Sequence, residues 1–496
     1  MPKLLAGTEV SPRSLAEARV VVLGIGRFGG GLGVARWLAS QGASVLASDR
    51  LPRAELGASP ELLEADGVEL LLGGHAGIDW KGVDLLVVNP AIPPQAPIVC
   101  EAREAGVTLS SEIALLMERW PGPMIGVTGS NGKSTTVGLT AAMLRALGRP
   151  AMAGGNLGGS LLRALDEVDA STTAVLELSS FMLEALPGGL PPVDVAVITN
   201  LTPNHLDRHG SMQSYAHAKA QVLRGARAAV LRADQSAVVD LAVDAPFDRR
   251  WFADGERPPA NPSLWVDAHG ALRDGRPEPR LAAGSFALPG RMNLLNLAAA
   301  ALATEALLGI ECQLDALAPR VVADYLPPPH RLAQVAEVHG VRWLNDSVST
   351  TPESTAASLE AVNARCVLIA GGRDKGLDAE PLIEAARRHA LRVLTVGEQA
   401  ESLAQALNRA GIPAEQVDTI SAAVRRAAVV ARPGEVVLLS PGYSSHDQFA
   451  HFEARAACFE AEVGRHAAQG NLAASRQKSG VRGGGDRKLG DRTAES

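Results

Sequence analysis

The sequence predicts an α/β protein of three domains, each with a parallel sheet whose strands alternate with helices. The chain has 496 residues, which at roughly 100–200 residues per domain corresponds to about three domains. Short apolar runs followed by helical stretches recur along the chain, as buried parallel strands require. A proline-rich segment, 326–331, cannot continue a helix and divides this pattern.

The composition excludes several classes of protein. With 46% apolar residues and a net charge of −7, the chain is not disordered as a whole, and we expect no nucleic acid partner. The most apolar long stretch, 294–310, contains Glu305, so we expect no transmembrane helix and no membrane insertion. The N-terminal residues lack the apolar core of a signal peptide, and the four scattered cysteines fit a reducing compartment. We therefore expect a cytoplasmic protein.

The first segment, residues 1–113, has the pattern of a Rossmann-like domain. An apolar run leads into Gly24-x-Gly26-x-x-Gly29, a helical stretch follows, and the next strand ends at Asp49. Glycines between a strand and a helix, with an acidic residue about 20 positions later, are the fingerprint of a dinucleotide site. Alone, this motif predicts an NAD or FAD enzyme, and a tight turn without a ligand is the alternative.

The second segment, 114–326, opens on a phosphate loop and predicts a P-loop ATPase-like domain. The run Thr128-Gly129-Ser130-Asn131-Gly132-Lys133-Ser134-Thr135 follows an apolar strand and precedes a helix. The amide groups of such a loop cradle phosphate oxygens, the lysine neutralises β/γ charge, and the serine is a ligand for Mg²⁺. The full spacing requires glycine where Val127 stands, so the loop is a variant.

Two further strands of the second segment lead to groups suited to a metal. Glu177 lies at the end of the apolar run 173–178, and His205 lies in the loop after the run 194–199. Because the carboxyl ends of parallel strands meet at one edge of a sheet, we expect both side chains near Ser134, as a set for Mg²⁺. Taken singly, His205 is explained as a polar loop residue.

Lysine usage singles out three positions. Only 7 of the 47 basic residues are lysines, so arginine serves wherever a generic positive charge suffices. Lys133, Lys219 and Lys375 each lie in a motif, and an amine performs chemistry that a guanidinium cannot. Lys219 lies on a predicted helix, 211–230, four residues after Tyr215. The alternative for Lys219 is a solvated surface lysine.

The third segment, 327–468, again alternates strands and helices. Polar groups follow three of its apolar strands, in the runs 345–347, 371–375 and 444–447. Singly they are turn residues, but three such strand ends in one sheet predict a second ligand crevice. The remaining tail, 469–496, lacks apolar periodicity, and we expect it to be disordered.

Together these motifs resemble the Mur ligases of peptidoglycan synthesis, over roughly residues 20–465. The segments that carry the resemblance stand in the family's order: TGSNGKST (128–135), GGNLG (154–158), ELSSF (177–181), TNLTPNHLDRHG (199–210), LPGRMNLLN (288–296), PHR (329–331), NDS (345–347) and LSPGYSSHDQF (439–449). Several motifs in order are more specific than either glycine loop alone. The resemblance implies a Rossmann-like domain for a uridine nucleotide, a P-loop ATPase-like domain and a Rossmann-like C-terminal domain for glutamate.

The resemblance implies an ATP-dependent amide ligase in peptidoglycan precursor synthesis. In the glutamate-adding step of this family, ATP phosphorylates the terminal carboxylate of UDP-N-acetylmuramoyl-L-alanine (UDP-MurNAc-L-Ala). The amine of D-glutamate then attacks the acyl phosphate, giving the amide, ADP and phosphate. The implied cofactors are ATP, two Mg²⁺ ions and a carbamate derived from CO₂ on a lysine. The implied partners are these small molecules, and we expect a monomer.

The resemblance also implies site residues, position by position. The catalytic positions are Lys133, Lys219, Glu177 and His205. The metal positions are Ser134, Glu177, His205 and the carbamylated Lys219. The ATP positions are Gly129, Ser130, Asn131, Gly132, Lys133, Ser134, Thr135, Thr136, Asn293, Asn296, Arg331 and Asp346. The UDP-substrate positions are Gly26, Arg27, Phe28, Asp49, Arg50, Asn89, Ala91, Asn156 and Ser179, and the glutamate positions are Thr350, Lys375, Ser445 and Phe452.

Several alternatives stay open at this point. The family often has a lysine where Val348 stands and an apolar residue where His446 stands, and both lie in the segment that selects the amino acid. L-glutamate is therefore an alternative to D-glutamate. Another Mur-type ligase, a folylpolyglutamate synthase and a non-catalytic nucleotide-binding regulator are further alternatives. An NAD-dependent dehydrogenase leaves the phosphate loop and Lys219 unexplained.

Overall fold

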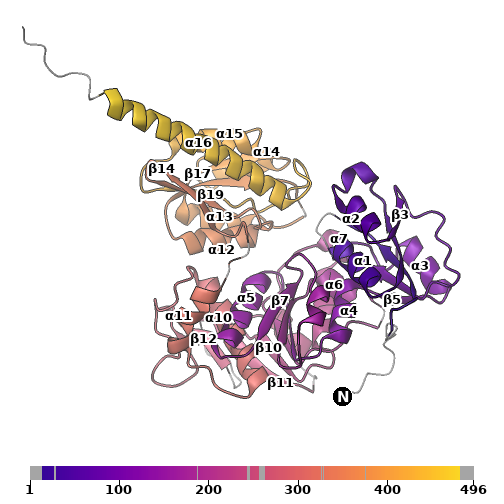
Figure 1. Cartoon of the computed structure of the whole chain (residues 1–496). Helices are drawn as coiled ribbons and strands as arrows, with labels where there is room; N and C mark the ends of the chain where they lie inside the picture. Colours follow the sequence, from indigo (N-terminus) through magenta and orange to yellow (C-terminus); the bar gives the residue numbers. More distant parts are fainter. Residues whose placement is uncertain are drawn as a thin grey trace, which may run out of the picture. The chain divides into compact units, whose positions relative to one another are not determined.

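A computed structural model describes residues 14–26, 30–186, 188–242, 246–255, 263–325, 327, 329–374 and 376–480 (Figure 1). The chain forms two compact units, residues 1–328 and 329–496. Within the described residues, the first unit contains two sheets and the second contains one, each flanked by helices. The predicted α/β class is confirmed. None of the described helices combines the length and the apolar character needed to cross a bilayer.

The first sheet is parallel throughout and has the strand order of a doubly wound nucleotide-binding domain. In spatial order its strands are β3 (Glu69–Leu72), β2 (Ser44–Asp49), β1 (Arg19–Leu23), β4 (Leu85–Val88) and β5 (Thr108–Ser110). Its helices are α1 (Gly30–Ser40), α2 (Ser59–Ala65), α3 (Pro97–Glu104) and α4 (Glu112–Arg119). Successive side chains of β1 alternate between the sheet's two faces: Val20 and Val22 pack with α1, and Val21 and Leu23 pack with α3.

The second sheet has eight strands and carries the phosphate loop after a central one. In spatial order they are β13 (Leu272–Arg273), β12 (Ser263–Val266), β11 (Asp248–Asp254), β10 (Ala228–Arg232), β9 (Val195–Ile198), β6 (Met124–Thr128), β8 (Thr173–Glu177) and β7 (Ala151–Gly155), and only the β12–β13 pair is antiparallel. The helices between its strands are α5 (Lys133–Ala146), α6 (Ser180–Glu184), α7 (Leu206–His209), α8 (Met212–Ala220) and α9 (Ser236–Val239). Helices α10 (Arg291–Leu308) and α11 (Leu314–Asp324) follow its last strand. Helices α5 and α10 pack against each other over one face of the sheet (Figure 1).

One apolar core runs through both sheets of the first unit. It joins Val20 of β1 and Trp37 of α1 to Leu176 of β8 and Ile198 of β9, and all four side chains are buried. The indole Nε1 of Trp120, at the end of α4, also donates a hydrogen bond to the Thr172 carbonyl at 3.0 Å. The boundary that we expected after residue 113 therefore lies within one compact unit, at the start of α4.

Glu112 lies half-buried at this junction, where its Oε1 accepts a hydrogen bond from the Ser160 hydroxyl at 2.6 Å. Burial raises the pKa of the Glu112 carboxyl above its usual value. The folded protein then binds this proton more tightly than the unfolded chain, so stability falls as pH rises from the ordinary Glu pKa through the raised one. Glu112→Gln, which keeps the acceptor for Ser160, is expected to raise Tm by about 2 °C at pH 7.5.

The Tm difference should narrow as the pH is lowered to 4.5, because the parent carboxyl is then protonated. Differential scanning fluorimetry across this pH range measures it. The control is Glu104→Gln, at the exposed end of α3, which should leave Tm unchanged. A Tm gain that stays constant with pH would show that the carboxyl charge is not its cause.

The second unit has a single six-stranded sheet with an apolar core on each face. In spatial order its strands are β14 (Ala333–Val338), β15 (Val341–Asn345), β19 (Val436–Leu439), β16 (Cys366–Gly371), β17 (Ala390–Val396) and β18 (Ala414–Gln416), and only the β14–β15 pair is antiparallel. Its helices are α12 (Pro352–Val362), α13 (Glu380–His389), α14 (Ala400–Arg409), α15 (Ile420–Val430) and α16 (Phe452–Gly480). Helix α16 continues past residue 468, where we expected the domain to end, and residues 481–496 lie outside the described part.

The predicted helix over 211–230 is wrong in its second half. Helix α8 ends at Ala220, Gly225 follows at φ 72°, and Ala228–Arg232 is strand β10 in the middle of the second sheet. The run AAVLR consists mostly of apolar residues that are fully buried in this strand. Short apolar runs of this kind fit a buried strand as well as a helix, so periodicity alone does not separate the two.

Candidate active site

The phosphate loop connects β6 to α5 through two glycines in conformations that other residues rarely adopt. Gly129 has φ 144° and Gly132, just before α5, has φ 81°. A Cβ at Gly129 would lie 1.9 Å from Thr199 Oγ1, and one at Gly132 would lie 2.4 Å from Asn296 Oδ1. Both positions are therefore restricted to glycine by the backbone and by their neighbours.

The loop after β9 holds the phosphate loop from one side. The side-chain amide of Asn200 pairs with both backbone groups of Asn131: its Oδ1 accepts from the Asn131 N–H at 2.9 Å and its Nδ2 donates to the Asn131 carbonyl at 2.9 Å. The Thr199 hydroxyl donates to the same carbonyl at 2.6 Å. The Ser130 hydroxyl donates to the Thr202 carbonyl at 2.8 Å. Sequence reasoning missed Thr199, Asn200 and Thr202.

Lys133 and the first amides of α5 are the positive groups of the loop. Lys133 Nζ donates a hydrogen bond to the Ser130 carbonyl at 2.9 Å, so the side chain lies across the loop. The first N–H groups of a helix have no acceptor within the helix and attract anions. Thr135 and Thr136 follow in the buried first turn of α5. This arrangement suits a bound phosphate group.

Ser134 and Glu177 meet at the edge of the sheet, as their strand ends predict. Val127 of β6 pairs with Glu177 of β8 in the parallel register. The Ser134 hydroxyl donates to Glu177 Oε2 at 2.6 Å, and Asn156 Nδ2 donates to Glu177 Oε1 at 3.0 Å. A hydroxyl and a buried carboxylate in contact beside a phosphate loop fit Mg²⁺, which prefers oxygen ligands. Ser179, predicted with Asn156 for the substrate, caps α6 by accepting from the Met182 N–H at 3.2 Å.

Lys219 is buried beneath the phosphate loop rather than solvated. Its Nζ donates to the Gly129 carbonyl at 2.7 Å and lies 4.7 Å from the centre of the Tyr215 ring. Burial, reinforced by the charge of Lys133 and opposed by Glu177, holds the pKa of Lys219 well below its usual value. Burial also raises the pKa of the Tyr215 hydroxyl, which lies 3.0 Å from the Ser130 hydroxyl, to about 12.

His205 lies just before α7 in a left-handed conformation, with φ 53°. Its ring packs against Phe181 of α6, with ring centres 5.0 Å apart. Within the described residues, no group of three or more His, Cys, Asp or Glu side chains is arranged to hold a metal by itself. A metal set built on Glu177 and His205 therefore needs other ligands as well.

Asn293 and Asn296, the ATP positions of α10, lie beside the phosphate loop. The Thr136 hydroxyl donates to Asn296 Oδ1 at 3.3 Å, and Asn296 Nδ2 donates to Asn293 Oδ1 at 3.3 Å. The other two predicted ATP positions, Arg331 and Asp346, belong to the second unit. There the Asp346 carboxylate is fully buried and accepts from the Ser358 and Ser440 hydroxyls at 2.6 and 2.7 Å. Burial raises the pKa of Asp346.

A pocket of about 690 Å³ opens at the carboxyl ends of β1, β2 and β4. It brings together five predicted UDP-substrate positions: Gly26, Asp49, Arg50, Asn89 and Ala91. Arg27 and Phe28, also predicted there, lie outside the described residues. Its wall also contains residues that sequence reasoning missed, among them His75, whose Nδ1 lies 2.8 Å from the Ser48 hydroxyl, and the apolar Ile78, Ile92 and Ile98.

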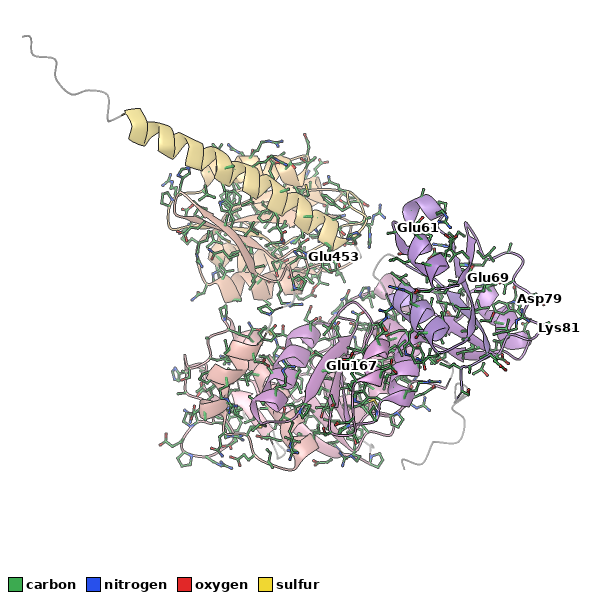
Figure 2. The ribbon with its side chains drawn as sticks, in the orientation of Figure 1. Glu61, Glu69, Asp79, Lys81, Glu167 and Glu453 are labelled. Carbon is green, nitrogen blue, oxygen red and sulfur yellow. The ribbon has the colours of Figure 1, made fainter. Side chains whose placement is uncertain are left out.

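Asp49 holds two backbone segments that line this pocket. Its Oδ2 accepts from the Gly26 N–H at 3.0 Å and its Oδ1 accepts from the Leu51 N–H at 2.9 Å. Asp49→Asn leaves one of these donors facing an amide N–H₂, so we expect the KM for the nucleotide substrate to rise about tenfold, with kcat and the KM for ATP unchanged. Steady-state kinetics measures this, with Glu69→Gln, exposed on β3 (Figure 2), as the control. Equal KM values in the Asp49 variant and its parent would contradict the assignment.

In the second unit, the loops after three strands are bonded to one another, and the ligand crevice predicted there stays a prediction. The Gly371 N–H donates to the Pro441 carbonyl at 2.8 Å, and the Gly442 N–H donates to the Ser349 carbonyl at 2.9 Å. The predicted glutamate positions Thr350, Ser445 and Phe452 lie in or next to these loops, and the Ser347 hydroxyl donates to the Phe452 carbonyl at 2.8 Å. Lys375, the fourth, lies outside the described residues.

Family models match most of the chain. The Mur ligase MurD-like N-terminal domain matches residues 18–111, the Mur ligase middle domain matches 127–304, and the Mur ligase glutamate ligase domain matches 330–442. Solved structures of Mur ligases share the fold at low sequence identity. MurC of Thermotoga maritima has a TM-score of 0.60 at 18% identity, covering 91% of this chain and 99% of its own. MurF of the same organism, in complex with ADP, has a TM-score of 0.54 at 18% identity, covering 91% and 96%.

Curated relatives match over almost their full length. A protein of Roseiflexus sp. named UDP-N-acetylmuramoylalanine–D-glutamate ligase is 38% identical over 88% of this chain and 96% of its own. Proteins of the same name from Pelotomaculum thermopropionicum and Anaeromyxobacter dehalogenans are 35% and 37% identical over 90% of this chain and 98% and 97% of theirs. The chain therefore belongs to the Mur ligase family.

Proposed function

We propose that the protein is the ATP-dependent ligase that joins D-glutamate to UDP-MurNAc-L-Ala in peptidoglycan precursor synthesis. One observation carries the proposal: a single compact unit contains both a phosphate loop with Ser134 bonded to Glu177 and a separate 690 Å³ pocket built on a nucleotide-binding sheet. A ligase that couples ATP to a nucleotide-linked acid needs these two sites. Relatives that carry this activity as their name match nearly their whole length.

The reaction needs a carboxylate to become an electrophile. The γ-phosphoryl group passes from ATP to the substrate carboxylate, so the bond to the β-phosphate oxygen breaks and an acyl phosphate forms. The glutamate amine then attacks the acyl carbon, the C–O bond to phosphate breaks, and the amine loses a proton. Lys133 and the amides that start α5 bind the phosphates and stabilise the charge that builds on the transferred group.

The residues present fit Mg²⁺ and a carbamate. Ser134 and Glu177 would hold the metal, together with His205 and a carbamate on Lys219, and the family resemblance implies two Mg²⁺ ions. Bound Mg²⁺ neutralises phosphate charge during transfer. The lowered pKa of Lys219 favours the neutral form of its amine over the charged form, and only the neutral amine adds to CO₂. That addition forms an N–C bond, releases one proton and converts a base into an anionic ligand.

Asp49, Arg50 and the Asn89–Ala91 turn would bind the uridine diphosphate in the pocket, and Asn156 and Ser179 would contact the muramoyl end. Thr350, Lys375, Ser445 and Phe452 would bind glutamate in the second unit, and Arg331 and Asp346 would complete the ATP site. We further propose a monomer in the cytoplasm, where ATP and nucleotide precursors are available.

The first experiment is phosphate release from ATP, Mg²⁺ and UDP-MurNAc-L-Ala, with D-glutamate compared to L-glutamate. Release that depends on D-glutamate supports the proposal. Release with L-glutamate alone would keep the mechanism and overturn the assignment of the amino acid. No release with either, in protein that binds ATP, would overturn the proposed function in favour of another acceptor or a regulator.

A further inference from the structure

Arg208 of α7 connects the nucleotide pocket to the helix that follows His205. Its Nη1 donates to the Ala91 carbonyl at 3.0 Å and its Nη2 approaches the Pro90 carbonyl at 3.4 Å. Both carbonyls belong to the turn after β4, in the first sheet, whereas α7 belongs to the second. The guanidinium therefore reaches from one sheet to the other.

The turn that Arg208 contacts is a wall of the pocket. Asn89 and Ala91 line it, and Asn89 Oδ1 accepts from the Ala91 N–H at 3.0 Å. Asn89 Nδ2 also donates to the Gly24 carbonyl at 3.2 Å, in the loop that opens the glycine motif. These two bonds tie the turn to the rest of the pocket, so the turn and the pocket move as one body.

The other side of the guanidinium is held by α6. Arg208 Nε donates to Glu184 Oε1 at 3.0 Å, and the guanidinium carbon lies 4.8 Å from the centre of the Phe181 ring. Phe181 packs on His205, and Glu184 Oε2 lies 3.2 Å from Nδ1 of the buried His209. Arg208 thus contacts the same aromatic group that supports His205.

We propose that Arg208 is a positioning residue that fixes the distance between the nucleotide pocket and the phosphate loop. The proposal rests on the proposed function. A substrate anchored in the first sheet must present its carboxylate to a phosphoryl group bound at the second, and a displacement of about 1 Å costs about 10²-fold in rate. The apolar core joins the two sheets over a wide area. Arg208 fixes their relative position at the turn that lines the pocket.

This role requires the shape of arginine. Its planar fork donates to Ala91 and Glu184 with different nitrogens while its flat face lies on Phe181. Lysine has one compact charge and replaces a single one of these contacts. The acceptors on the pocket side are backbone carbonyls, so the contact depends on the course of the turn and not on its side chains.

The experiment compares Arg208→Ala and Arg208→Lys with the parent protein. We expect Arg208→Ala to lower kcat about 10²-fold, with smaller loss in Arg208→Lys, while the Kd of UDP and the Kd of a non-hydrolysable ATP analogue stay within twofold. Guanidinium ion at about 20 mM should restore part of the kcat of Arg208→Ala, and ammonium at equal ionic strength should not. The nucleotide pocket and the phosphate loop should each keep their affinity, because only their placement relative to each other changes.

The matched control is Arg145→Ala. Arg145 likewise joins a carboxylate, Asp324, at 2.7 Å and a backbone carbonyl, that of Ala151, at 3.1 Å, but away from the pocket. Its loss should leave kcat unchanged. If Arg208→Ala fails to fold, as judged by its Tm, Arg208→Lys carries the test.

Three results would overturn the inference: kcat within twofold of the parent in both Arg208 variants, a matching fall in kcat for Arg145→Ala, or a loss of UDP or ATP-analogue binding that accounts for the fall in kcat. These outcomes are distinct from failure of the proposed function, which would show as absence of turnover in the parent protein itself.

Discussion

Lys219→Arg is expected to lose phosphate release by about 10³-fold even though it keeps the positive charge. If Lys219 only balanced charge near the loop, arginine would serve. The buried amine, 2.7 Å from the Gly129 carbonyl and with a lowered pKa, instead fits the reaction with CO₂, which a guanidinium does not undergo. Loss of the carbamate removes an anionic ligand from a metal ion whose stabilisation of transition-state charge is worth several kcal/mol.

Two further measurements separate this prediction from misfolding. In Lys219→Ala, which leaves room beneath the loop, added formate or acetate should restore part of the activity by taking the place of the carbamate. In the parent protein, ¹³C-labelled bicarbonate should give a carbamate signal by NMR that is absent from both variants. Lys81→Arg, at an exposed position (Figure 2), is the control for lysine replacement as such. A fully active Lys219→Arg protein would rule out the carbamate.

Lys133→Ala is expected to lower kcat by about 10²–10³-fold, with a smaller rise in the KM for ATP. Its ammonium lies across the phosphate loop, bonded to the Ser130 carbonyl at 2.9 Å, where a phosphate oxygen bound in the loop would be a second acceptor for it. Charge on the transferred phosphoryl group builds in the transition state, so the loss falls mainly on kcat. ATP-dependent phosphate release measures it.

The charge of Lys133 also affects Lys219, and this gives a second measurement. Because Lys133 helps to lower the pKa of Lys219, its removal should raise that pKa toward the ordinary value. The bicarbonate dependence of the carbamate signal should then move to higher pH in Lys133→Ala. Lys81→Ala should change neither quantity. Parent-like turnover in Lys133→Ala would refute the phosphate-loop assignment.

Motifs at strand ends were the part of the site that the sequence predicted well. Ser134 and Glu177, 43 positions apart, meet because both follow parallel strands whose register is fixed. The contact of Asp49 with Gly26 has the same geometric origin, although the sequence singled out Asp49 only as part of the dinucleotide fingerprint. The glycine loops were predictable because few residues other than glycine adopt their backbone angles. The family resemblance supplied the roles of these residues, which spacing alone did not.

Sequence reasoning missed residues whose contacts leave no recognisable pattern in the neighbouring sequence. Asn200 and Thr199 follow a strand like many loop residues, and only the fold shows that they clamp Asn131. Arg208 is one of 40 arginines and gains its position from a turn more than 100 residues earlier. The error over 211–230 has the same origin, since tertiary burial decided that AAVLR forms a strand.

The clamp on Asn131 has a thermodynamic consequence. Fixing the backbone of one residue costs roughly 1–2 kcal/mol of conformational entropy at 25 °C. Because Asn200 and Thr199 bond both backbone groups of Asn131, this ordering is complete when the chain folds and does not weaken the affinity for ATP. The loop is thus a rigid receptor, in which the free energy of phosphate contacts goes to binding and catalysis rather than to shaping the site.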